Sequence, residues 1–236
     1  MKEDTIYQHG TLAMLIPGLF DGTLPISRLL EHGDSGIGTC AGLDGEMVVL
    51  GGHAYTIRRD GTVEELAGDV TVPFATVHFD APKFSLPLKG QDFAQVKQTL
   101  LAAKPLENIF FAVKITGTFA KMKTRTVFKQ EKPYPGLNAV ADQQAVFEGK
   151  NTQGTVIGYF APELFQGVAS SGFHLHYLSD DHQLGGHILD LTVGEATAYL
   201  QPFANFQLHL PLENPDFMQQ RFDLASLGDQ ISKAEH

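Results

Sequence analysis

The chain has 236 residues, enough for one large domain or for two lobes that share a core. With 43% hydrophobic and 19% charged residues, it has the composition of an ordinary globular protein. The net charge of −10 and the lack of basic runs argue against nucleic acid as a partner. The single cysteine, Cys40, excludes a disulfide framework within the chain and a cysteine-based zinc site.

The N-terminal segment lacks the pattern of a secretory leader. Residues 1–4 are acidic in balance, and the apolar run over residues 12–20 is short and broken by Pro17 and Gly18. A membrane span needs about 20 consecutive apolar residues. We therefore expect a cytoplasmic protein that has no membrane as a partner.

The first half of the chain mixes helix and strand patterns. Apolar residues at helical spacing predict an amphipathic helix over 91–104, and Gly33 marks the end of a short helix over 25–32. Glycines at positions 51 and 52 predict a two-residue hairpin turn between strands over 46–50 and 53–58.

Strands dominate the rest of the chain. Alternating residues predict two paired strands over 108–119 and 121–129, and further strands over 154–160, 196–200 and 206–210. Two short helices are expected at 215–222 and 229–235. Helices are few and not regularly interleaved, which favours an α+β fold with mixed or antiparallel sheets. The polar run 149–153 suggests an N-terminal lobe of about 1–150 and a C-terminal lobe of about 151–236.

The most informative feature is a predicted hairpin over residues 172–187 that carries three histidines. Alternate strand residues share a face, so His174 and His176 point the same way. If the turn is centred between Asp180 and Asp181, His187 lies directly opposite His174. Facing Cβ atoms are about 4.5–5.5 Å apart, so three imidazoles could bind one ion at roughly 2.0–2.1 Å each. A one-residue slip would move His187 to the other face.

Three imidazoles without a thiolate are typical of a catalytic metal site. Structural zinc is usually closed by four ligands, whereas three ligands leave a position for water or substrate. The alternative is a polar strand face, since the chain has ten histidines. An HxH pair alone is a weak signal. The third histidine in register is what favours the metal site in the C-terminal half.

Several sequence blocks resemble one enzyme family. They are GDSGIGT at 33–39, LDGE at 43–46, TRTV at 124–127, QEKPYP at 130–135, GFHLH at 172–176 and GGH at 185–187. In these blocks, and in their order and spacing over nearly the whole length, the chain resembles the α-acetolactate decarboxylases. The resemblance implies a zinc-dependent lyase that converts 2-acetolactate into acetoin and carbon dioxide. It also implies two packed lobes that act as a single catalytic unit, and a homodimer.

The resemblance also implies the residues of the site. Its three zinc ligands fall on the histidines of the predicted hairpin. The other implied residues are a catalytic arginine at Arg125, a glutamate at Glu46, a second glutamate at Glu235 and a pocket threonine at Thr39. Glu213 competes with Glu235 for the position of the second glutamate. Without the resemblance, the arginine and both glutamates would be interpreted as ordinary solvated charges.

The chemistry of 2-acetolactate accounts for these groups. Loss of carbon dioxide sends electrons into the neighbouring ketone and gives an enediolate, so neither pyridoxal phosphate nor thiamine diphosphate is needed. A metal ion with an open position is a Lewis acid for the developing charge. Arg125 suits the carboxylate, because a guanidinium binds it through two parallel hydrogen bonds. Glu46 or Glu235 could donate the proton that gives a single acetoin enantiomer.

Two other functions fit the histidines. A cupin-like metal oxygenase also places HxH on a β-hairpin, but it usually adds a glutamate a few residues later, and residues 178–181 here contain none. The second alternative is a non-catalytic protein that binds a metal or another ligand.

Overall fold

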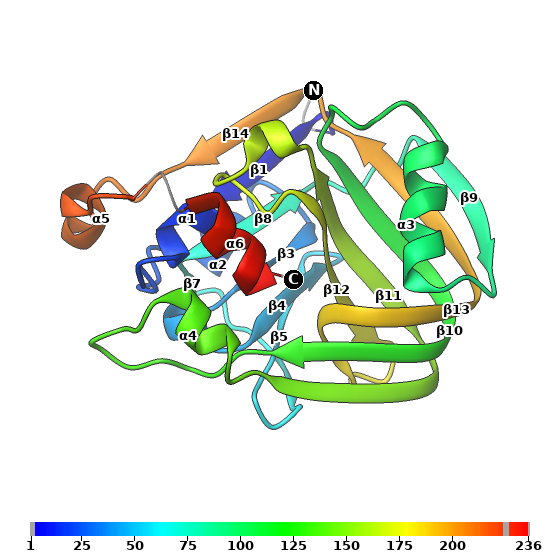
Figure 1. Cartoon of the computed structure of the whole chain (residues 1–236), viewed down its shortest axis with the longest axis horizontal. Coiled ribbons are helices and arrows are strands. Elements are labelled where there is room, and N and C mark those ends of the chain that lie inside the picture. Colours follow the sequence, from blue (N-terminus) through cyan, green and yellow to red (C-terminus); the bar gives the residue numbers. More distant parts are fainter. Residues whose placement is uncertain (1–2, 224–226, 236) are drawn as a thin grey trace.

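The structure is a computed structural model that describes residues 3–223 and 227–235. Its strands form two large sheets and one small two-stranded sheet, with few helices (Figure 1). This confirms the predicted α+β fold. The small sheet consists of β2 (Leu24–Pro25) and β7 (Thr71–Val72).

The first large sheet has seven strands in the order β14-β1-β8-β3-β4-β5-β6. Its pairs are antiparallel except for β1 and β14, which run parallel, so the sheet is mixed. The strands are β1 (Thr5–His9), β3 (Ser35–Thr39), β4 (Glu46–Leu50), β5 (His53–Ile57), β6 (Val63–Glu65), β8 (Phe74–His78) and β14 (Asn205–His209). The predicted hairpin with its two-glycine turn is β4 and β5.

The second large sheet has the order β10-β11-β12-β13-β9, and β10 also pairs with β13. The strands β10 to β13 therefore close into a ring of long, curved strands (Figure 1). The members are β9 (Phe84–Lys89), β10 (Phe111–Thr126), β11 (Ala145–Ala161), β12 (Gly172–Ser179) and β13 (Gly185–Pro202). The predicted helix over 91–104 is α3 (Phe93–Ala102), which packs on this sheet through Val96 and Leu100.

Both faces of the second sheet are buried near its centre. Val156 on β11 points into the core inside the ring, whereas its neighbour Ile157 joins the core between the two large sheets. This follows from the two-residue period of a strand. The two sheets pack face to face, and β11, β12 and β13 lie against β3 and β4.

Three short helices close one end of the interface between the sheets. They are α1 (Leu12–Leu15), α4 (Leu137–Ala141) and α6 (Leu227–Glu235), and they share an apolar cluster that includes Leu15, Val140 and Ile231. The remaining helices are α2 (Ile26–Leu29) and α5 (Pro215–Gln219). In Figure 1, α5 projects from the body of the molecule beyond β14.

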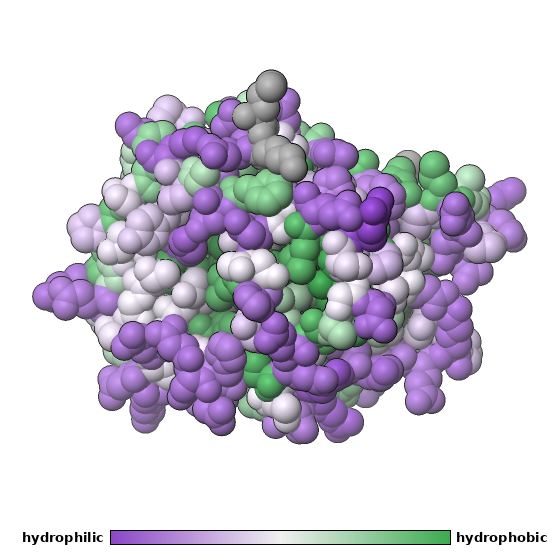
Figure 2. All heavy atoms as spheres, turned by 180° about the vertical axis from the view of Figure 1, so that it is seen from behind, coloured by the Kyte–Doolittle hydropathy of each residue, from purple (hydrophilic) through white to green (hydrophobic). Residues whose placement is uncertain are grey.

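The face of the molecule opposite to that of Figure 1 is mainly polar. Charged and polar side chains predominate on this face, and apolar atoms show in small groups and in hollows (Figure 2). Scattered apolar groups of this kind are normal for a folded chain. In the part of the chain that the structure describes, no helix combines the length and the apolar character needed to cross a membrane.

One predicted pair of strands is a single strand. The stretches 108–119 and 121–129 were expected to pair with each other, but both belong to β10, which pairs with β11 and β13. The register along β13 shifts on either side of Phe119. The break in alternation is therefore a bulge within a long strand, which lets it bend, and not a turn. The predicted helix over 25–32 is also shorter, since α2 ends at Leu29.

The chain does not pass from one sheet to the other at the polar run 149–153. Strand β11 continues through residues 149–153, and the chain passes from the first sheet to the second between β8 and β9. The C-terminal β14 then returns to the first sheet. Lobes of about 1–150 and 151–236 remain a prediction about domain organisation.

Candidate metal centre

The histidine hairpin forms, but its register differs from the predicted one by two residues. His176, and not His174, faces His187 across β12 and β13. The connection is longer than the tight turn expected, because the backbone N–H of Ser179 bonds to the carbonyl of Leu184 and leaves four residues in the loop. Since side chains alternate every residue, a slip of two keeps all three histidines on one face.

The three imidazoles converge. One ring nitrogen from each lies within 4.8 Å of the others, and the ring centroids are 4.9 to 5.6 Å apart. His176 and His187 are buried, and His174 is partly exposed toward a pocket. Three nitrogen ligands this close can hold a divalent metal ion and leave a coordination position open.

A backbone contact fixes the tautomer of His176. Its Nδ1 lies 2.9 Å from the carbonyl oxygen of Met47 on β4, and a carbonyl only accepts. The proton is therefore on Nδ1, and Nε2 presents its lone pair toward the other two histidines. Burial, together with the nearby His174, lowers the pKa of His176 well below 6.5. A neutral imidazole is the form that binds metal.

Arg125 belongs to the same cluster. On β10 it pairs directly with His187 of β13, and this close approach requires Gly186. Gly186 has a φ of 121°, and a Cβ there would lie 2.4 Å from the carbonyl oxygen of Arg125. A larger residue would push the two strands apart beside His187.

Glu46 connects Arg125 to the histidines. Its Oε1 accepts a hydrogen bond from Nη1 of Arg125 at 3.2 Å, and its Oε2 lies 3.4 Å from Nε2 of His176. The side chains of Arg125 and Glu46 are only 6% and 9% exposed. Glu46 comes from the first sheet, whereas Arg125 and His176 come from the second. The cluster therefore forms only where the two sheets meet.

A pocket opens onto this cluster. Its polar wall consists of Thr39, Glu46, Arg125, His174 and His176. Its apolar lining comes mainly from short helices and loops: Leu12, Leu15, Leu43, Phe74, Val127, Leu137 and Ala141. Ile231 of α6 packs into the same apolar cluster, so the C-terminal helix covers this apolar wall.

The other predicted residues lie as follows. Thr39 lines the pocket, and its hydroxyl donates to the carbonyl of Gly45 at 2.8 Å. Glu235 is the last residue of α6, and its side chain is outside the described part of the chain. Glu213 lies away from the histidines and lines a separate cavity beside His209.

Some parts of the site left no readable signal in the sequence. The carbonyl of Met47 is a backbone group, and any residue type could supply it. The apolar wall comes from helices of four or five residues, such as α1 and α4, which are too short for a periodic pattern to be recognised.

The fold and the cluster define a β-rich protein in which three histidines that could hold a metal ion lie beside a buried arginine and glutamate. The sequence profile of the alpha-acetolactate decarboxylase family matches residues 6–224. A protein of that name from Methanosarcina mazei is 41% identical, over 98% of this chain and 80% of its own length. The crystal structure of alpha-acetolactate decarboxylase from Bacillus subtilis strain 168 superposes with a TM-score of 0.95 at 32% identity, over 98% of this chain and 99% of that one. The crystal structure of a Staphylococcus aureus protein described as similar to alpha-acetolactate decarboxylase also superposes with a TM-score of 0.95. Its sequence identity is 38%, over 98% of this chain and all of that one.

The chain belongs to the α-acetolactate decarboxylase family, a family of carboxy-lyases. The resemblance stated from the sequence blocks is thus confirmed.

Proposed function

We propose that the protein decarboxylates 2-acetolactate to acetoin and carbon dioxide with the help of Zn²⁺ held by His174, His176 and His187. The observation that carries this proposal is the convergence of three imidazoles, an arginine and a glutamate at one pocket, in a chain of this family. When bound, zinc would supply Lewis-acid stabilisation of negative charge on oxygen.

Arg125 binds and orients the substrate carboxylate. Its guanidinium is nearly excluded from water and lines the pocket beside the histidines. In such a site an ionic hydrogen bond is stronger than in water, and a guanidinium can form two of them to one carboxylate. Holding the carboxylate out of the plane of the neighbouring ketone aligns the bond that breaks with the electron-accepting carbonyl.

In its protonated form, Glu46 donates the proton that completes the reaction, and water restores that proton after product release. Decarboxylation leaves an enediolate, which must be protonated on the carbon that carried the carboxylate. Glu46 lies between Arg125 and His176, next to the place where that carboxylate was bound. Delivery from one side gives one enantiomer of acetoin. A contribution of Glu235 as a second carboxyl group remains a prediction.

The apolar wall keeps bulk water from the enediolate. Leu12, Leu15 and Phe74 line the same pocket as the polar groups and can contact the methyl groups of the substrate. Excluding water strengthens the contacts of Arg125 and prevents protonation on the wrong face.

The test is direct. Purified protein loaded with zinc is mixed with racemic 2-acetolactate, and acetoin and carbon dioxide are measured together with metal content and oxygen uptake. We expect acetoin and carbon dioxide in equal amounts without oxygen consumption. Zinc-saturated protein that forms no acetoin would contradict the proposal, and oxygen consumption would identify the cupin-like oxygenase instead.

We further propose a homodimer. In the described part of the chain, β14 is an edge strand whose outer side pairs with no other strand. An open edge is a natural template for pairing with a second chain. Leu208 on β14 and Leu212 after it are 37% and 69% exposed. Light scattering coupled to size exclusion tests this, and a monomer mass would contradict it.

The cytoplasmic location remains a prediction, which cell fractionation would test.

A further inference from the structure

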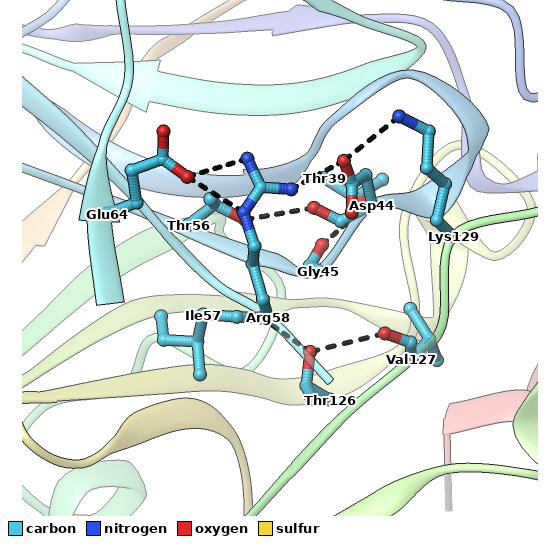
Figure 3. A network of polar contacts seen from close by, with 10 residues as sticks. All are labelled: Thr39, Asp44, Gly45, Thr56, Ile57, Arg58, Glu64, Thr126, Val127 and Lys129. Atoms are coloured by element: carbon cyan, nitrogen blue, oxygen red, sulfur yellow. Dashed lines mark hydrogen bonds and ion pairs between the residues drawn. The ribbon is translucent and has the colours of Figure 1, made fainter. Parts of the chain in front are cut away.

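A charged cluster surrounds the turn that leads into Glu46 (Figure 3). Asp44 precedes Glu46 by two residues, and its Oδ2 accepts a hydrogen bond from Nη1 of Arg58 at 2.5 Å. The same oxygen lies 3.3 Å from Nζ of Lys129. The guanidinium of Arg58 also contacts a second carboxylate, because its Nε donates to Oε2 of Glu64 at 2.8 Å. Asp44 is thus the shared anion of two cations.

Two threonine hydroxyls bind the backbone of the same turn. Thr56 donates to the carbonyl of Asp44 at 3.0 Å, and Thr39 donates to the carbonyl of Gly45 at 2.8 Å. Gly45 has a φ of 91°, and a Cβ there would lie 2.4 Å from the carbonyl oxygen of Ile57. Asp44 and Gly45 are therefore held in place by the ion pairs of the Asp44 side chain, by hydrogen bonds to both of their carbonyls and by close packing at Gly45.

The same patch also supports Arg125. Ile57 pairs with Glu46 across β4 and β5, and its carbonyl accepts a hydrogen bond from Thr126 at 2.7 Å. Thr126 directly follows Arg125 on β10. Lys129 also comes from the segment that follows β10, so the carboxylate of Asp44 joins the first sheet to the second beside the pocket.

We propose that Asp44, through its ion pairs with Arg58 and Lys129, is a positioning residue that fixes the carboxyl group of Glu46 between Arg125 and His176. The steric course of protonation then depends on Asp44, although Asp44 does not line the pocket. This inference rests on the proposed function, because it acts through the role of Glu46 in that reaction.

Stability alone does not explain the cluster. The side chains of Asp44 and Arg58 are 20% and 32% exposed, and that of Lys129 is 64% exposed. Ion pairs with this much access to water contribute little to folding. Their effect on geometry is larger, because a displacement of about 1 Å at a reacting group can reduce a rate by about a hundredfold.

The main variant is Asp44→Asn, which preserves size and removes the charge. We expect kcat to fall by about tenfold or more, while KM changes by less than about twofold and zinc content stays equal to that of the wild type. The enantiomeric excess of the acetoin should also fall, a readout that a loss of stability does not change. Arg58→Gln should behave similarly, and Arg58→Lys should recover part of the rate because it retains a cation.

Glu64→Gln is the matched control. Glu64 binds the same guanidinium from the solvent side and is 54% exposed, so its loss leaves the contact between Arg58 and Asp44 in place. We expect its rate and enantiomeric excess to stay within about twofold of the wild type. A double-mutant cycle completes the test: in a Glu46→Gln background, Asp44→Asn should cause little further loss.

The outcomes separate the two proposals. Wild-type protein that forms no acetoin removes the proposed function and, with it, this inference. An active wild type whose Asp44→Asn variant retains its rate and its enantiomeric excess overturns the positioning role alone. Fully additive losses in the double-mutant cycle overturn it as well, because they show that Asp44 acts independently of Glu46.

Discussion

At the residue scale, His176 contacts both parts of the site. Its Nδ1 donates to the carbonyl of Met47 on the first sheet, and its Nε2 points toward the other histidines and Glu46. This division of its two nitrogens gives the imidazole a fixed tautomer and a fixed ring orientation. A metal site at this position therefore depends on contacts that single residues make, and single substitutions test it.

His187→Ala should remove the metal. With two of three ligands left, the site loses most of its affinity. We expect less than about a tenth of the wild-type zinc after dialysis, measured by elemental analysis, and a parallel loss of acetoin formation. His182→Ala, in the loop of the same hairpin, is the control and should retain zinc. Equal zinc in both variants would exclude His187 as a ligand.

Arg125→Lys should preserve zinc and lose most of the activity. Lysine retains the charge but lacks the planar fork that binds a carboxylate through two hydrogen bonds. We expect a fall in kcat/KM of about a hundredfold, measured by steady-state acetoin formation. Lys123→Gln on the same strand removes only an exposed pair with Glu148 and serves as the control. Unchanged turnover in Arg125→Lys would remove Arg125 from the mechanism.

At the element scale, the site depends on how closely β10 and β13 approach. Arg125 and His187 are paired residues of these strands, and Gly186 allows the contact. A predicted register for β12 and β13 that is wrong by two residues still places every side chain on the correct face of the hairpin, because side chains alternate with a period of two.

Gly186→Ala should damage both stability and metal binding. The new Cβ would meet the carbonyl oxygen of Arg125, and alanine is strained at a φ of 121°. We expect unfolding free energy to fall by about 1–3 kcal/mol, measured by urea denaturation, together with weaker zinc binding. Gly228→Ala in α6 is the control, because a Cβ there meets no atom of the described residues within 4 Å. Similar effects of both substitutions would contradict the close-approach argument.

At the scale of the whole molecule, the two sheets are joined by buried polar contacts as well as by an apolar core. His78 of β8 is 1% exposed, and its Nδ1 lies 2.8 Å from the hydroxyl of Tyr159 on β11. Burial is the largest cause that lowers the pKa of His78 from 6.5 to about 4. The interface between the sheets is therefore sensitive to acid.

The free energy of unfolding should decrease as the pH falls from about 6.5 toward 4. In this range the unfolded chain binds a proton at His78 and the folded chain does not, so protonation favours unfolding. The full contribution of His78 is about 3 kcal/mol, since one pKa unit corresponds to about 1.36 kcal/mol. Urea denaturation of the wild type and of His78→Asn at pH 7 and pH 5 tests this, and about 2 kcal/mol of that contribution should be lost at pH 5 in the wild type alone. An equal loss of stability in both proteins would exclude His78 as the cause.

The prediction of the fold from the sequence was correct where patterns are local. The turn with two glycines, the helix α3 and the strand-rich composition were all readable, because turn chemistry and periodicity act over a few residues. The long strand β10 was divided in two, because a bulge and a turn both interrupt alternation. Only its pairing with two neighbouring strands shows that β10 continues as one strand through the bulge.

The sequence by itself determined the family and the face on which the three histidines lie, because motif blocks and the two-residue period of a strand are local properties. It could place Arg125 and Glu46 only by resemblance, since nothing in their spacing says that residues 79 positions apart form a hydrogen bond. The tertiary structure decided that contact, the Met47 carbonyl behind His176 and the apolar wall of the pocket. Each of these arises where two sheets meet, and packing between sheets is fixed by the whole fold and not by any one segment.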